Sequence, residues 1–172
     1  IKHGETDSDA LTEPLVNGLS QAAEDLKQVR LQEGSRLTEV LKEKLQILDE
    51  LTEALRQLVP DILAEHQTKL EARLANLSVD VEPERIAQEV VLMAQKADVA
   101  EELDRLNAHV AEVRDILSHG GTCGRRLDFL MQELHREANT LGSKSIATAT
   151  SQGAVNLKVI IEQMREQIQN IE

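Results

Sequence analysis

Apolar residues recur every three or four positions along most of the chain, and this spacing places them on one side of an α-helix. The longest run carries leucine or isoleucine at Leu37, Leu41, Leu45, Leu48, Leu51, Leu55, Leu58 and Ile62. Pro60 lies inside this run without a polar turn around it. We therefore expect a kink in one long helix, with a tight turn as the alternative.

Shorter runs with the same spacing predict helices on both sides of the long one. A first helix is expected from about Asp9, and Gly34 is a possible kink or stop. A turn over residues 78–83 should lead into a helix that starts at Pro83. Asp98 and Glu101 have the spacing of a capping box, so that helix should bend or restart there. The apolar positions continue with Leu103, Leu106, Val110, Val113 and Leu117.

The segment from 119 to 124, with three glycines, is the plainest break in the pattern. The helix after it has a clear apolar side made of Leu127, Leu130, Met131, Leu134, Ala138 and Leu141. We expect Gly142 to cap its C-terminus, residues 143–153 to form a polar loop or weak helix, and a closing helix to follow. The closing helix carries Leu157, Ile160, Ile161, Met164 and Ile168.

No alternating strand pattern interrupts these helices, so the fold class is all-α, with long amphipathic helices packed as antiparallel hairpins or a bundle. We expect residues 1–82 to form a helical scaffold or oligomerisation region and residues 83–172 a C-terminal helical domain. The chain has one Phe and no Trp or Tyr, which predicts an aliphatic core. It begins at Ile1 without a signal peptide or a membrane-spanning run, so we expect a fragment or processed product. The single Cys123 suits a reducing compartment such as the cytosol.

The net charge of −12 disfavours nucleic acid at first sight, but the charge is unevenly distributed. Residues 124–144 hold four basic and three acidic side chains, whereas acidic residues dominate the sequence before them. Arg125, Arg126, Arg136 and Lys144 could hold phosphates, with Gln132 and Asn139 contacting hydroxyls or bases. An intersubunit face explains the same residues equally well. The lack of stacking aromatics argues against sequence-specific reading of single strands.

Two further constellations could carry chemistry. Glu133 and Glu137 lie one helical turn apart and could share a divalent cation with a third oxygen ligand, although salt bridges are the commoner role of such pairs. His109 could act as a general base or ligand near Glu102 and Asp104, although a lone surface histidine is more often inert.

Three segments resemble the C-terminal region of the YicC-like endoribonucleases, which are bacterial cytoplasmic proteins. The segments are QEVVLMAQKADVAEELDRLNAHV, GRRLDFLMQELHREANTLGSKS and LKVIIEQMREQIQNIE. The family usually has Asn where this chain has His135, and a more acidic, regular helix where it has IATATSQGAV. The resemblance implies an absent N-terminal domain, RNA as the partner, homohexamers, and RNA cleavage that depends on manganese or magnesium.

On this resemblance, we interpret the chain as part of a metal-dependent endoribonuclease without a membrane or small-molecule cofactor. Glu133, Glu137 and His109 are the candidate catalytic residues, and Glu133, Glu137 and Glu102 are the candidate metal ligands. The alternative is a non-catalytic helical module for protein interaction or oligomerisation.

Overall fold

The computed structural model describes residues 8–76 and 83–169, and this part of the chain is helical without a strand, which confirms the all-α prediction. The helices are α1 (Ser8–Asn76), α2 (Pro83–Lys96), α3 (Ala100–His119), α4 (Gly124–Lys144) and α5 (Thr148–Ile168). None of them is long and apolar enough to cross a membrane. The chain divides into two compact units between Glu39 and Val40.

In the first unit, α1 exposes every side chain from Leu11 to Glu33. Its large apolar residues include Leu15, Leu19, Leu26 and Val29, each between 56% and 74% exposed. These positions are separated by three, four or seven residues, so they share one side of the helix. This side has no cover within its own unit.

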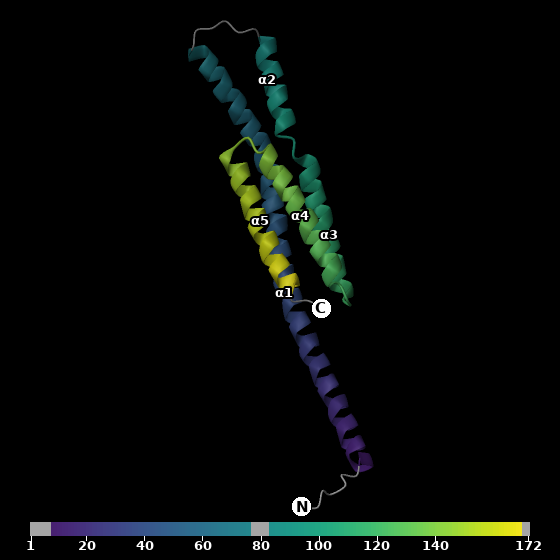
Figure 1. The fold of residues 1–172 in the computed structure, drawn as a ribbon. Helices are drawn as coiled ribbons and strands as arrows, with labels where there is room; N and C mark the ends of the chain where they lie inside the picture. The colour runs from purple at the N-terminus through teal and green to yellow at the C-terminus, as the bar shows by residue number, and fades with distance from the viewer. Residues whose placement is uncertain (1–7, 77–82, 170–172) are drawn as a thin grey trace, which may run out of the picture. The chain divides into compact units, whose positions relative to one another are not determined.

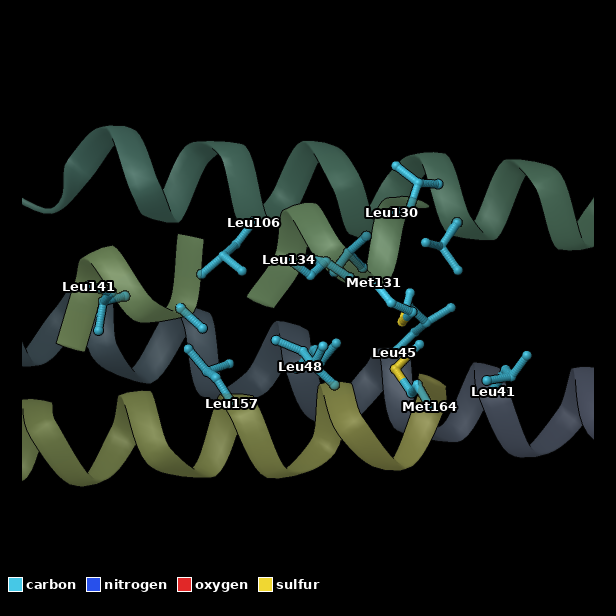
Figure 2. Close-up of a cluster of buried hydrophobic side chains, with 14 of the residues drawn as sticks. Leu41, Leu45, Leu48, Leu106, Leu130, Met131, Leu134, Leu141, Leu157 and Met164 are labelled. Carbon is cyan, nitrogen blue, oxygen red and sulfur yellow. The ribbon is translucent and has the colours of Figure 1, made fainter. Parts of the chain in front are cut away.

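In the second unit, the remainder of α1 joins α3, α4 and α5 around an aliphatic core, as the lack of aromatics predicts. Figure 2 shows Leu45 and Leu48 of α1 facing Met131 and Leu134 of α4, with Leu157 of α5 beside them. Leu41, Leu45 and Leu48 are at most 1% exposed. The apolar side of α1 between residues 41 and 62 is therefore covered within its own unit, although we expected it to pair subunits.

Short loops join α3 to α4 and α4 to α5, so each pair forms an antiparallel hairpin (Figure 1). Gly120 and Gly121 adopt φ angles of 68° and 89° in the first loop. These left-handed conformations are accessible to glycine at little cost, which explains the break predicted there. Helix α4 lies against both α3 and α5.

Helix α1 continues through Gly34 and Pro60, so a stop at the first and a tight turn at the second are both wrong. Pro83 begins α2 as predicted, whereas residues 77–82 of the expected turn lie outside the described residues. The predicted restart near Asp98 is confirmed, because α3 begins at Ala100 and Asp98 Oδ1 accepts a hydrogen bond from the Ala100 N–H at 3.2 Å.

Of the two alternatives for residues 143–153, the polar loop is wrong for all but residues 145–147, because α4 continues to Lys144 and α5 already begins at Thr148. The glycines there serve helix packing. A Cβ on Gly153 would lie 2.5 Å from Leu55 Cδ2, so the Leu55 side chain would have to shift to accommodate any larger residue there. A Cβ on Gly142 would meet the Ala154 Cβ at 3.4 Å.

Candidate functional site

Helix α4 has four sides with different surroundings, because successive residues are rotated by about 100° around the axis. One side is buried in the core. One flank faces α3, where Arg126 donates a hydrogen bond to Glu112 at 2.8 Å. The opposite flank faces α5, where Arg165 donates to Asp128 at 3.3 Å. The fourth side points to solvent.

The boundary between α3 and α4 carries a series of charged residues, which we call the α3–α4 seam. Its members are Glu102, Arg105, His109 and Glu112 on α3 and Arg126, Glu133, Glu137 and Lys144 on α4. Three ion pairs cross the seam. Lys144 Nζ lies 2.9 Å from Glu102 Oε1, Arg105 Nη1 lies 3.4 Å from Glu137 Oε1, and Arg126 Nη2 lies 2.8 Å from Glu112 Oε1.

Two carboxylates of the seam are buried. Glu102 is 7% exposed and Glu137 is 4% exposed. The Oε2 atom of Glu102 has no hydrogen-bond partner among the described residues. The ion pair between Lys144 and Oε1 is therefore the interaction that offsets the cost of burying this carboxylate. The hydrogen bond with Glu102 raises the pKa of Lys144, against the opposing effect of desolvation. Hydrogen bonds to Glu137 and Glu101 likewise raise the pKa of Arg105.

The register of the hairpin places His109 within one helical turn of Glu133. The ion pairs match residue 105 with 137 and 112 with 126, so residue 109 lies opposite about residue 131, two positions from Glu133. His109 is half-buried, and Glu133 accepts hydrogen bonds from Arg136 Nη1 at 3.4 Å on both oxygens. The seam therefore contains every predicted catalytic or metal residue, namely Glu102, His109, Glu133 and Glu137, but Glu102 lies at the level of Lys144, about three turns from Glu133.

Asp104 does not belong to this group, although the sequence suggested that it lies near His109. It faces α1, where Arg56 Nη2 reaches Asp104 Oδ1 at 2.7 Å. Residues two positions apart on a helix point about 200° apart, so Glu102 and Asp104 cannot share one neighbour.

The carboxylates of the seam are of the type that binds Mg²⁺ or Mn²⁺, but protein cations already contact them. Lys144 forms an ion pair with Glu102, and Arg105 forms one with Glu137. Within residues 8–76 and 83–169, no three histidine, cysteine, aspartate or glutamate side chains converge to hold a metal ion. The described residues alone therefore do not form the metal site that the resemblance implies.

The solvent side of α4, which we call the outward stripe, carries Arg125, Phe129, Gln132 and Arg136. All of these residues are exposed. Gln132 Nε2 donates to Asp128 Oδ2 at 2.8 Å, and Arg136 donates to Glu133. Arg125 makes no hydrogen bond or ion pair with any described residue.

The predicted RNA-binding residues are thus divided between two sides of α4. Arg125, Gln132 and Arg136 lie on the outward stripe. Arg126 and Lys144 are paired across the seam. Asn139 follows Gln132 by seven residues and therefore lies within about 20° of it around the axis, next to the outward stripe, with its Nδ2 atom 3.1 Å from His135 Nδ1.

Sequence reasoning missed Phe129, which is 57% exposed on the outward stripe. The signal was present in the sequence. Arg125, Phe129, Gln132 and Arg136 follow one another at intervals of four, three and four residues, so Phe129 lies on their side of the helix and not with the apolar residues of α4.

Residues 55–172 match the family model described as "Endoribonuclease YicC-like, C-terminal". The chain belongs to this family. Two curated YicC proteins, each named "Probable endoribonuclease YicC", are similar to it over its whole length. The protein of Haemophilus influenzae is 44% identical over 172 residues, and that of Clostridioides difficile is 33% identical over 175 residues.

The chain spans 60% of the length of each of these YicC relatives. The match to the YicC-like family model contains the complete α3–α4 seam and the complete outward stripe. It begins at Leu55, the α1 residue that lies against Gly153. Both candidate surfaces therefore lie in the region by which the family is recognised.

Proposed function

We propose that this chain is part of an endoribonuclease that cleaves RNA phosphodiester bonds, with α4 as the helix that contacts the RNA. The family supports the reaction class, because its relatives are named probable endoribonucleases. One observation on α4 carries the proposal further. Arg136 belongs to the outward stripe and contacts Glu133 of the seam at 3.4 Å. A phosphate held on the stripe would therefore lie next to the seam carboxylates.

In this proposal, the arginines of the stripe position a phosphate and offset the charge that develops on its oxygens. His109 and Glu133 are the candidates for taking a proton from the attacking oxygen, because they lie within one turn of each other along the seam. Glu137 is held by Arg105 and helps to set the charge around them. A divalent cation, manganese or magnesium, would further neutralise the phosphate. Additional ligands would have to come from outside the described residues.

We further propose that the active enzyme contains an additional N-terminal domain and is a cytoplasmic homo-oligomer, with a hexamer as the expected form. The length of the relatives supports the additional domain. The free thiol of Cys123 is compatible with a reducing compartment. On this basis, the 172-residue chain alone should cleave RNA poorly.

The decisive experiment measures cleavage of a labelled RNA by the full-length protein and its Glu133→Gln, Glu137→Gln and His109→Asn variants. We expect cleavage to fall by about a hundredfold or more in the glutamate variants, with RNA affinity retained or increased. Glu112→Gln is the matched control, because Glu112 lies on the same seam but pairs with Arg126.

Titration of each protein with manganese, magnesium and a chelator tests the metal requirement. Wild-type rates in both Glu133→Gln and Glu137→Gln at all metal concentrations would show that α4 carries no catalytic carboxylate. Unchanged cleavage by the wild-type protein in excess chelator would refute the metal requirement alone.

A second candidate function is a helical interaction module, and the exposed apolar side of residues 11–29 favours it. Leu15, Leu19 and Leu26 have no cover within their unit, and such surfaces commonly bind a partner helix. Light scattering of the 172-residue chain tests this candidate. An oligomer that Leu19→Glu and Leu26→Glu convert to a monomer would support it, whereas a wild-type monomer at tens of micromolar would exclude self-pairing at ordinary weak-dimer affinity.

A further inference from the structure

The chain has a single Phe and no Tyr or Trp, and this Phe lies outside the core. Phe129 is 57% exposed, whereas the neighbouring Leu127 and Leu130 are at most 1% exposed. Single exposed apolar residues are common and need no function. The surroundings of Phe129 are informative, however, because its ring projects from a stripe whose other members are two arginines and an amide.

The charges around Phe129 are suited to an anionic strand. Arg125 precedes it by four residues, which corresponds to about 6 Å along the helix axis, and lies within about 40° of it around the axis. Arg125 has no ion-pair partner among the described residues, so its guanidinium is available to a phosphate. Gln132 lies about one turn beyond Phe129 and can contact a base edge or a ribose hydroxyl.

The exposure of the Phe129 ring favours unpaired RNA over duplex RNA as its ligand. Bases in a duplex are stacked on one another, and the major groove of A-form RNA is too deep and narrow for side chains to read. A phenyl ring on a convex helix surface can stack only on a base that has left the duplex. Aromatic side chains next to cations are the usual platform for single-stranded nucleic acid.

We propose that Phe129 is a base-stacking residue that binds one unpaired nucleotide of the RNA, while Arg125 holds an adjacent phosphate. This inference rests on the proposed function and specifies its substrate as RNA with an unpaired segment. It also revises the expectation that the chain lacks a stacking aromatic.

The test compares binding of a labelled single-stranded 12-mer by the full-length protein and its Phe129→Leu, Phe129→Trp and Val159→Ala variants, in chelator to suppress cleavage. We expect Phe129→Leu to weaken binding about tenfold, because one stacked base typically contributes that much. The slope of log K against log salt should stay unchanged, since no phosphate contact is lost. Phe129→Trp should bind at least as tightly as wild type. Val159→Ala, another exposed apolar position, should have no effect.

A second measurement uses the absence of Trp and Tyr from the 172-residue chain. The indole introduced by Phe129→Trp is then its only strong fluorophore, and stacking should quench its emission on addition of oligo(U). An oligomer of abasic ribose phosphates should leave the emission unchanged. Equal quenching by both oligomers would overturn stacking, because it would report backbone binding alone.

The possible failures are distinguishable. If the wild-type protein binds RNA but Phe129→Leu binds equally well, stacking is wrong and the proposed function stands. If the wild-type protein does not bind RNA, the proposed function fails and this inference fails with it. If Phe129→Leu alters only the sedimentation of the protein, the residue is a contact between protein chains and the inference is overturned.

Discussion

The α3–α4 seam and the outward stripe are neighbouring sides of one helix, yet they use charge in opposite ways. On the seam, Lys144 and Arg126 are engaged by carboxylates of α3, and two of the seam carboxylates are buried. On the stripe, Arg125 has no partner among the described residues and Phe129 is 57% exposed. The comparison separates charges that hold the hairpin together from groups that remain available for a ligand.

The largest effect should come from breaking the buried pair of the seam. Lys144→Met leaves Glu102 buried without a partner on either oxygen, which should lower the free energy of unfolding by about 1–3 kcal/mol. Thermal unfolding followed by circular dichroism should show a fall in Tm of about 2–4 °C per kcal/mol for a chain of this size. Arg125→Met is the matched control and should leave Tm unchanged. Equal Tm values for the wild type, Lys144→Met and Arg125→Met would show that the seam pair contributes no more to stability than an unpaired arginine of the stripe.

The same pair should give the seam a characteristic pH dependence. Glu102 raises the pKa of Lys144 above its ordinary value of 10.5, so the folded state holds this proton more tightly than the unfolded state. The stabilisation is therefore fully present below pH 10.5 and is lost as pH rises through the folded pKa. In urea unfolding, the difference between wild type and Lys144→Met should be constant from pH 7 to about 9 and shrink above about 10.5. A difference that grew with alkaline pH would refute the pairing.

The smallest effect distinguishes two adjacent arginines. Arg125→Met should remove one counterion-releasing contact with RNA and reduce the slope of log K against log salt by nearly one unit. Arg126→Met should change the slope less, because Arg126 already pairs with Glu112 at 2.8 Å. Fluorescence anisotropy between about 50 and 200 mM salt measures both slopes. Equal changes would show that the pair with Glu112 opens when RNA binds.

The sequence was sufficient for most of the fold. Apolar spacing predicted the core sides of α3, α4 and α5, and glycine clustering predicted the loop before α4. It failed at Gly142 and Gly153, because local rules treat glycine as a helix terminator. Here Gly153 lies inside a helix and is closely approached by the side chain of Leu55, which lies almost a hundred positions away in the sequence. No local signal contains such a contact.

The candidate site was less predictable, for a physical reason. Sequence spacing assigns a residue to a side of its own helix, but it does not say which neighbour that side meets. Lys144 is a predicted phosphate ligand, and its spacing on α4 gave no sign of the ion pair that it makes with Glu102 of α3. Phe129 was overlooked because apolar residues are expected in the core, although its own spacing already placed it with Arg125.

The contact between Gly153 and Leu55 also bears on where a stable fragment could begin. The family match starts at Leu55, but Leu41, Leu45 and Leu48 precede it and belong to the same core. A protein trimmed to residue 55 would retain the glycine contact and lose three leucines that cover α4 and α5. The region matched by the family model is therefore shorter than the folding unit, and a limited digest should spare residues 40–54 together with the helices they cover.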